Sequence, residues 1–477
     1  MSVEVETQEP TPIETPPAVA ASPAAASVRQ PAWRMRRYQV TALLVALVFV
    51  AAVVGNNFFS RQYSPDGAVR QYLSALQSGD ANSAWSVIQV LAPSGSAQVS
   101  LIDRAALRAA LASAKPDIKN FAITSTTISD STTSMVDFSY DTSQGTKQAK
   151  FLVQRSGDNH FGIYPTWHLV IQPTLLQFSL PSGGGGVSID GKSVSLPTGK
   201  STVAVLPLGH KIQFVATSML ASQSLAVDTF FSLAQSVAYQ PKLTDAGMLK
   251  AKAAVKAAFD ACAKQTGLAP AGCPQSYSNA FASVTQWHVV GDPTQDLAIG
   301  SDLHSNLVAI GHFQMLVAYQ EDGIDGTSHS ASSGPYSAAL SLSSADVSVT
   351  SVQAIAGAPG LQRPSGATDQ AAKDLVTKAF AACASAKSWA PADCPQRLSA
   401  PDVSNVSWKL NGDPLGGSSV TFHQNSGLVM VKGSFAMTAN FTVSGYPYSR
   451  DSYNTTYEAD LLWDGQALQL VTISGDF

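Results

Sequence analysis

The sequence contains few charged residues and no excess of basic ones. Only 13% of its 477 residues are Asp, Glu, Lys or Arg, and 29 Lys and Arg against 33 Asp and Glu give a formal net charge of -4. A nucleic-acid-binding surface needs a basic excess to neutralise phosphates, so the composition argues against that class of protein. Four cysteines are too few for a disulfide-rich miniprotein or an array of zinc modules.

Long hydrophobic runs are also scarce, and only one is long enough to cross a membrane. Residues 38–59 are mostly apolar and reach the roughly 20 residues that a spanning helix needs. Four arginines precede this run, namely Arg29, Arg34, Arg36 and Arg37. By the positive-inside rule we expect one transmembrane helix in the cell membrane, a cytoplasmic N-terminus and an extracytoplasmic part, residues 60–477. The alternative is a cleaved signal peptide, although the preceding region is long and Val-Val-Gly is a poor cleavage site.

The tail before the apolar run, residues 1–37, is rich in Pro, Ala, Ser, Thr and Glu and has almost no large apolar residues. Such a segment cannot bury enough surface to offset the entropy lost on ordering. We therefore expect a disordered cytoplasmic tail.

The first extracytoplasmic segment, module one (residues 64–171), combines helical and strand patterns. The helical spacing of Val69, Tyr72, Leu73 and Leu76 predicts a helix that ends before Gly79-Asp80. A second helix is expected after Asp80 and carries Ile88, and a third is expected near 102–114. Alternating, β-branched runs that begin at Phe121, Ser134, Lys150 and Trp167 predict an antiparallel sheet.

The pattern Y-L-x-A-L-x-x-G-D-x-x-x-A-W, from Tyr72 to Trp85, resembles the NTF2-like superfamily. This resemblance covers about a hundred residues, most of module one, and implies an α+β cone. Cones of this kind enclose small molecules, serve as enzymes or act as inert spacers. If the cone here binds a small molecule, Asp137, Tyr140 and His168 are the candidate pocket residues.

Module two (residues 172–228) has short alternating strands separated by Gly and Pro. VSIDGKSV predicts a hairpin with Asp190-Gly191 at its turn. The run Gly183–Gly186 is either a flexible loop or a turn. Together with Leu206-Pro207-Leu208-Gly209, the hairpin resembles the PEGA-like β-modules of envelope proteins, which implies a spacer or a binding surface.

Module three (residues 245–355) and module four (residues 366–477) form an internal repeat. Phe259 and Phe380 lie 121 residues apart, and one offset relates rare residues across both segments. It relates Cys262 to Cys383, Cys273 to Cys394, Trp287 to Trp408 and Gly291-Asp292-Pro293 to Gly412-Asp413-Pro414. Each unit starts with an Ala-rich helix and continues into strands. We therefore expect a multidomain α+β chain ending in two homologous α+β domains.

Each cysteine pair has the form C-x10-C-P, which favours a structural disulfide. Outside the membrane such pairs oxidise, so we expect the bonds Cys262–Cys273 and Cys383–Cys394. A zinc site would need shorter spacing or neighbouring histidines, and a redox-active pair is usually C-x-x-C.

Templates for catalysis and for metal or cofactor binding are lacking. G-x-S-x-G, S-x-x-K and H-E-x-x-H are absent, and Gly199-Lys200-Ser201 lacks the first glycine of a P-loop. The acidic stretch 321–326 departs from a calcium loop and is interpreted as a hairpin loop. We therefore expect no catalytic residue, metal or cofactor.

The remaining conspicuous side chains have structural interpretations. Trp287 and Trp408 could stack on glycans, but their repetition favours core positions. Asp292 and Asp413 are expected to cap the G-D-P turns rather than act as acid or base. His168, His288 and His312 lie in strand-like runs and are more often solvent-facing or satisfied in a core than ligands.

Two hypotheses for function follow from these patterns. The first is a non-enzymatic, membrane-anchored envelope protein that binds a cell-wall polymer or an envelope protein through its outer modules. The alternative is a small-molecule binder or enzyme that uses the cone of module one. The architecture resembles TcaA-type proteins of Gram-positive envelopes but lacks their N-terminal zinc ribbon, because residues 1–37 contain no cysteine. The Ala-rich composition and the C-x10-C-P unit resemble actinobacterial envelope proteins.

Overall fold

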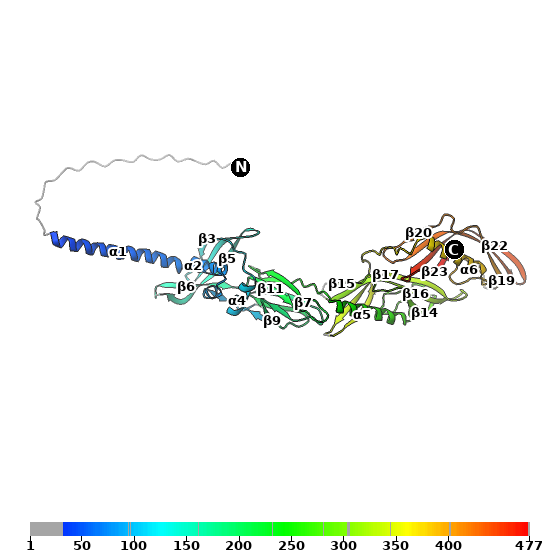
Figure 1. The fold of residues 1–477 in the computed structure, drawn as a ribbon, viewed down its shortest axis with the longest axis horizontal. Coiled ribbons are helices and arrows are strands. Elements are labelled where there is room, and N and C mark those ends of the chain that lie inside the picture. Colours follow the sequence, from blue (N-terminus) through cyan, green and yellow to red (C-terminus); the bar gives the residue numbers. More distant parts are fainter. Residues whose placement is uncertain are drawn as a thin grey trace, which may run out of the picture.

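The computed structural model describes residues 32–475, except 94, 96, 161, 231, 280, 303–305, 344 and 400–401. Most of the tail expected to be disordered, residues 1–31, lies outside the described residues. The chain is elongated: helix α1 (Ala32–Gln62) is at one end, and the four modules follow one another to the other end (Figure 1). The fold is mixed α+β.

Helix α1 leads directly into module one. Its part Thr41–Gln62 is long and apolar enough to cross a membrane, and none of the side chains that the structure describes in it is buried. Ser64 caps the next helix by accepting a hydrogen bond from the backbone N–H of Gly67 at 3.0 Å. A side chain at Gly67 would collide with the carbonyl oxygen of Gln62, so the close joint between the two helices requires glycine.

Module one consists of helices on one five-stranded sheet, ordered β1-β6-β5-β4-β3. Its elements are α2 (Pro65–Ser78), α3 (Ala81–Trp85), β1 (Ile88–Val90), β2 (Val99–Leu101), α4 (Arg104–Ser113), β3 (Phe121–Ile128), β4 (Thr133–Thr142), β5 (Gly145–His160) and β6 (Tyr164–Ile171). Helix α3 ends at Trp85, and Ile88 begins a strand instead of continuing the helix as expected. The strand forms because Ile88 pairs in parallel with Leu169 of β6.

Module two is built from two four-stranded sheets, β13-β7-β10-β2 and β12-β11-β8-β9. Its strands are β7 (Thr174–Leu180), β8 (Val187–Ile189), β9 (Lys192–Val194), β10 (Gly199–Val205), β11 (Gly209–Phe214), β12 (Gln223–Asp228) and β13 (Ala234–Ser236). The expected hairpin is present as β8 and β9, with positive φ at Asp190 and Gly191. Strand β2 of module one pairs with β10 in one of these sheets, and β13, which lies after residue 228, pairs with β7 in the same sheet. This sheet therefore includes strands from outside residues 172–228, the range expected for module two.

Modules three and four have the same order of elements, a helix packed on an antiparallel sheet. Module three contains α5 (Asp245–Ala263), β14 (Ala282–Val289), β15 (Ala298–Ser301), β16 (Leu307–Glu321), β17 (Ser328–Leu342) and β18 (Val347–Ala354). Module four contains α6 (Asp369–Ser385), β19 (Val403–Asn411), β20 (Ser419–Phe422), β21 (Val429–Val443), β22 (Tyr446–Trp463) and β23 (Leu468–Gly475). The sheets are ordered β14-β16-β17-β18 and β19-β21-β22-β23, with β15 and β20 as short extra strands.

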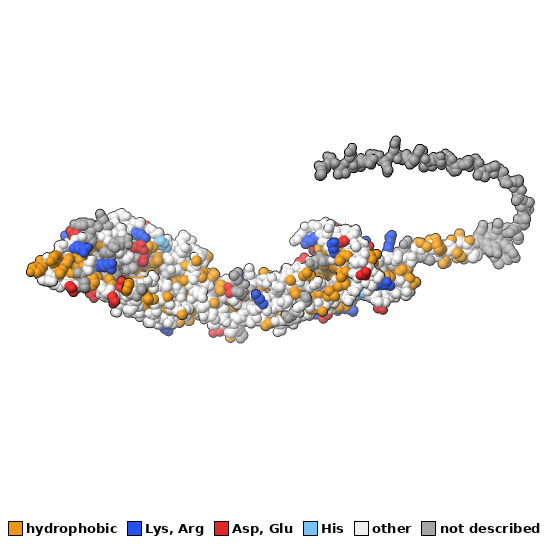
Figure 2. Space-filling view, turned by 180° about the vertical axis from the view of Figure 1, so that it is seen from behind, with side chains coloured by type: hydrophobic (Ala, Val, Ile, Leu, Met, Phe, Trp, Pro, Cys, Tyr) orange, Lys and Arg blue, Asp and Glu red, His pale blue; other side chains and the backbone are white. Residues whose placement is uncertain are grey.

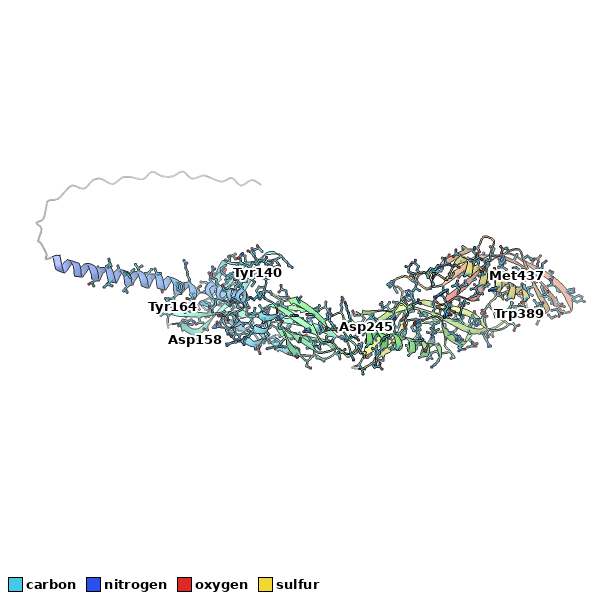
Figure 3. All side chains as sticks on the ribbon, in the orientation of Figure 1. Tyr140, Asp158, Tyr164, Asp245, Trp389 and Met437 are labelled. Carbon is cyan, nitrogen blue, oxygen red and sulfur yellow. A yellow bond between two sulfur atoms is a disulfide. The ribbon has the colours of Figure 1, made fainter. Side chains whose placement is uncertain are left out.

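The junction between modules two and three is tightly packed. A side chain at Gly183 would come within 2.6 Å of the carbonyl oxygen of Leu342 in β17, and Gly183 has a positive φ of 67°. Part of the glycine run is therefore a contact point between modules. Met219 and Leu220 enter the core of module three, and the carbonyl oxygen of Met219 accepts from the backbone N–H of Thr244 at 2.9 Å. Thr244 directly precedes Asp245, the first residue of α5, which Figure 3 labels. These contacts limit bending at the junction.

Candidate functional site

The end of module one beside helix α1 carries a cluster of aromatic side chains. Phe59 of α1 and Tyr63, the residue just after this helix, lie beside Tyr164 at the start of β6, with ring centroids 6.0 and 5.7 Å apart. The Tyr164 hydroxyl donates a hydrogen bond to Asn56 at 2.8 Å, and Tyr63 stacks on His160 at 4.5 Å. Figure 3 labels Tyr164 at this end. Module one is thereby attached to the end of the apolar helix.

The interior of module one is filled with apolar side chains. Phe138 stacks on Phe151 with centroids 5.1 Å apart, and Tyr72 meets Phe151 edge-on. Of the three candidate pocket residues, only Tyr140 faces this core. Asp137 forms an ion pair with Lys150 at 3.1 Å, and Asp137 and His168 alternate with core-facing neighbours along their strands. The three candidates are not brought together.

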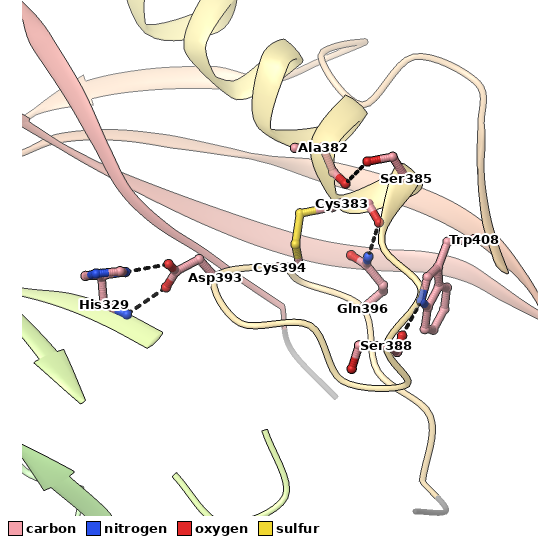
Figure 4. The surroundings of a disulfide bond; sticks show 9 residues. All are labelled: His329, Ala382, Cys383, Ser385, Ser388, Asp393, Cys394, Gln396 and Trp408. Atoms are coloured by element: carbon pink, nitrogen blue, oxygen red, sulfur yellow. Dashed lines mark hydrogen bonds and ion pairs between the residues drawn. A yellow bond between two sulfur atoms is a disulfide. The ribbon is translucent and has the colours of Figure 1, made fainter. Parts of the chain in front are cut away.

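Both expected disulfides are present. Cys262 is bonded to Cys273 and Cys383 to Cys394, and each bond fastens a loop to the end of its helix. A buried glutamine strengthens each loop: the Nε2 of Gln275 donates to the carbonyl oxygen of Cys262 at 2.9 Å. The counterpart, from Gln396 to Cys383, is 2.8 Å long (Figure 4).

Trp287 and Trp408 are buried in the cores of their modules. The indole N–H of Trp287 donates to the carbonyl oxygen of Gly267 at 3.0 Å, and that of Trp408 donates to Ser388 at 2.9 Å. Each tryptophan thus closes the disulfide loop of its own module. Burial leaves neither ring free to stack on a glycan.

Asp292 and Asp413 occupy matching turns. Oδ1 of Asp292 accepts from the backbone N–H of Thr294, and Oδ1 of Asp413 accepts from that of Leu415, both at 2.9 Å. Burial would raise the pKa of Asp292, but the hydrogen bonds from Thr294 and the nearby positive charges of two lysines outweigh it and lower the pKa. Both side chains therefore serve as turn caps in these contacts.

The acidic loop between β16 and β17 joins modules three and four. The backbone N–H of Asp325 donates to Ala390 at 3.0 Å, within the disulfide loop of module four. Beside it, Nδ1 of His329 lies 2.6 Å from Oδ2 of Asp393 (Figure 4). Sequence reasoning missed this contact because it joins residues of two modules. The one available signal was that position 393 is Asp where the matching position, 272, is Gly.

The equivalent hairpin of module four, β21–β22, ends in exposed aromatic side chains. Tyr446 is 69% exposed and Tyr448 is 52% exposed, and Tyr448 stacks on Phe441 with centroids 5.9 Å apart. A hollow of about 380 Å³ is lined by Tyr448 and six further residues: Asn405, Asn440, Phe441, Thr442, Pro447 and Ser449. In Figure 2, apolar side chains cluster at the end of the molecule farthest from α1. Sequence reasoning did not single out these residues.

The histidines of the strand-like runs in module three differ in environment. His288 is exposed on β14, whereas His312 is buried on β16 and its Nδ1 lies 2.6 Å from Oδ2 of Asp296. Among the described residues, no group of three or more His, Cys, Asp or Glu side chains could hold a metal ion.

Comparison with known proteins yields little. No family model matches the chain, and no curated protein matches it. Among solved structures, it is similar to an "Ntf2 like protein involved in plasmid conjugation", with 7% identity, 41% of this chain and 78% of that chain covered, and a TM-score of 0.14. That score carries no argument about fold or function, so the NTF2-like nature of module one remains a prediction.

Proposed function

We propose that this chain is a non-enzymatic envelope protein, anchored in the cell membrane by one helix, that binds cell-wall polymer at its outermost module. Residues 1–37 would be cytoplasmic and residues 60–477 extracytoplasmic. Two disulfides in the part after the helix support this orientation, because such bonds persist in oxidising compartments. The arginines before the apolar run support it independently.

The modules before the tip are suited to a spacer. The aromatic cluster of Phe59, Tyr63 and Tyr164 would lie at the membrane–water interface, where amphipathic rings are favoured. Module one, in this view an NTF2-like cone filled by its own core, then rests on the membrane. The packed junctions hold the outer modules away from it. The arrangement is that of the TcaA-type proteins in outline, without a zinc ribbon.

The exposed aromatic tip of module four is the observation that carries the proposal. The matching hairpin of module three is docked on module four, whereas Tyr446 and Tyr448 remain open to solvent. Large exposed apolar side chains gathered at one place mark interaction surfaces. Aromatic faces beside amide and hydroxyl groups suit a sugar ring, whose C–H face stacks while its hydroxyls form hydrogen bonds. The low charge of the chain favours a largely neutral polymer over a charged one.

Co-sedimentation with protein-free cell-wall sacculi tests the proposal. The full chain, held in lipid nanodiscs, should sediment with the sacculi, and the double variant Tyr446→Ala/Tyr448→Ala should lose about thirtyfold in affinity, since each of the two stacked rings contributes about 1 kcal/mol. Phe281→Ala is the matched control, because Phe281 is 79% exposed but lies on module three. Equal sedimentation of the double variant and the wild type would refute the proposal.

A further inference from the structure

A cavity of about 470 Å³ lies between modules three and four. Its floor is the face of β16 opposite α5, where Ile310, His312 and Gln314 alternate with core residues. Residues 358–362 and Pro364 of the segment that links the modules, residues near the G-D-P turn of module three, and the aromatic side chains Phe422 and Trp463 of module four also line it. The volume suits a small molecule, not a polymer.

The walls of this cavity are held in place by hydrogen bonds. The backbone N–H of Leu361 donates to the carbonyl oxygen of Gln424 at 2.9 Å, which fixes the linking segment to module four. Gln314 of module three donates to the carbonyl oxygen of Ser426 at 3.4 Å. Gly366 lies so close to the ring of Trp463 that a side chain there would collide with it. The cavity is therefore built by both modules together.

His312 is the feature that points to a ligand. Its side chain is 3% exposed, and its Nδ1 lies 2.6 Å from Oδ2 of Asp296, whose Oδ1 accepts from the backbone N–H of His312 at 3.2 Å. Its other ring nitrogen, Nε2, is buried and has no hydrogen-bond partner among the described residues. A buried polar atom without a partner is costly, and a bound molecule would remove that cost.

The hydrogen-bonded pair of His312 and Asp296 determines which polar group a ligand needs. In the neutral imidazole whose Nδ1 proton is accepted by the Asp296 carboxylate, Nε2 is an acceptor. The described residues that line the cavity include Asp292 and Asp296 but no lysine or arginine, so the site disfavours an anion. Phe422, Trp463 and Leu361 provide an apolar wall.

We propose that this cavity binds a small, non-anionic molecule that places an O–H or N–H donor on His312 Nε2 and an apolar body against Phe422 and Trp463. The site is separate from the aromatic tip. Module four cannot repeat it, because its positions matching Asp296 and His312 are Gly417 and Ser434. The ligand would touch both modules and strengthen their contact.

The test uses 2-naphthol and 2-methoxynaphthalene, which share an apolar body and differ in the hydroxyl proton. Hydrogen exchange of the full chain in nanodiscs reports binding at the site itself. We expect 2-naphthol to slow exchange in residues 358–364 and to bind about fivefold tighter than 2-methoxynaphthalene, as one hydrogen bond provides. Equal protection by the two probes, or no protection by 2-naphthol, would overturn the proposal.

Variants locate the site. His312→Phe should lose the preference for 2-naphthol, whereas His288→Phe, on the exposed face of β14, should keep it. If His312→Phe does not fold, as exchange across module three would reveal, Phe422→Ala tests the apolar wall instead and should weaken the protection by both probes. Wild-type protection in the folded His312→Phe variant, or in Phe422→Ala, would contradict the proposed site. Tyr446→Ala/Tyr448→Ala should bind 2-naphthol normally, so failure of tip binding and failure of this site are distinguishable.

Discussion

Nδ1 of His329 in module three lies 2.6 Å from Oδ2 of Asp393 in module four, and the backbone N–H of His329 donates to Oδ1 of the same carboxylate at 2.7 Å. Burial raises the pKa of Asp393, although the hydrogen bonds from His329 oppose that rise. Asp393 has a positive φ of 58°, and the matching residue of module three, Gly272, has a φ of 76°. The two modules therefore share the left-handed backbone conformation at this position, but only module four has a carboxylate there, and that carboxylate binds module three.

Asp393→Gly should loosen the contact between the two modules without straining the backbone. The variant loses two hydrogen bonds, and we expect exchange in residues 322–329 to accelerate by about tenfold, corresponding to about 1–2 kcal/mol. Asp393→Asn keeps one acceptor and tolerates the left-handed conformation, so its effect should be smaller. Unchanged exchange in Asp393→Gly would show that the hydrogen bonds between His329 and Asp393 do not hold the hairpin.

Removal of the two disulfides should affect the contact between modules three and four differently. Removing either pair by Cys→Ala should destabilise its own module by about 3 kcal/mol, the value for a loop of this length. Only Cys383→Ala/Cys394→Ala should also accelerate exchange in residues 322–329, because the loop between these cysteines receives the hairpin of module three. Cys262→Ala/Cys273→Ala is the matched control, and acceleration of equal size in both variants would be inconsistent with the structure.

Asp460 should make module four less stable at neutral pH than in mild acid. Burial, and then the negative charge of Glu458, raises the pKa of Asp460 from 3.8 to about 6. Since the folded state favours the protonated form, this contribution to stability falls as pH rises from about 4 to about 6.

Asp460→Asn should remove this pH dependence and raise the stability of module four at pH 7 by up to about 3 kcal/mol, measured by calorimetry on the full chain. Asp464→Asn is the control of opposite sign, because backbone N–H donors from Ala467 and Gln466 lower the pKa of Asp464. A stability of Asp460→Asn at pH 7 equal to that of the wild type would rule out the assigned cause.

Tyr336 and Tyr457 should contribute equally to their modules. The hydroxyl of Tyr336 donates to the carbonyl oxygen of Pro293 at 2.8 Å, and that of Tyr457 donates to Pro414 at 2.9 Å. Each ring meets a helix phenylalanine with centroids 4.9 Å apart. Tyr336→Phe and Tyr457→Phe should each cost about 1 kcal/mol in chemical denaturation. A loss of stability in only one of the two variants would show that the two tyrosines do not have the same role in their modules.

Local patterns in the sequence predicted much of this architecture. The alternating runs from Phe121 to Trp167 became strands β3 to β6, and Asp190-Gly191 became the turn of a hairpin. The cysteine pairs are bonded as expected. These features succeeded because each depends on residues close in sequence or on strict spacing between two copies.

Contacts between distant segments could not be predicted in the same way. Strand β2 joins a sheet of module two because Val99 pairs with Val203, and nothing in its three residues specifies that partner. His312 and Asp296 are ordinary strand and loop residues until the sheet brings them within hydrogen-bonding distance. The exposure of Tyr446 and Tyr448 likewise depends on distant parts of the chain, because the described residues leave this hairpin uncovered.

Photocrosslinking in intact cells tests the proposed role most directly. A photoreactive phenylalanine analogue would replace Tyr446 in the full chain, with the same replacement at Phe281, exposed on module three, as the control. We expect a crosslink to cell-wall polymer from position 446, detected by mass spectrometry after wall digestion, and none from position 281. Crosslinks from position 446 only to proteins, or equal polymer crosslinks from both positions, would contradict a polymer-binding tip.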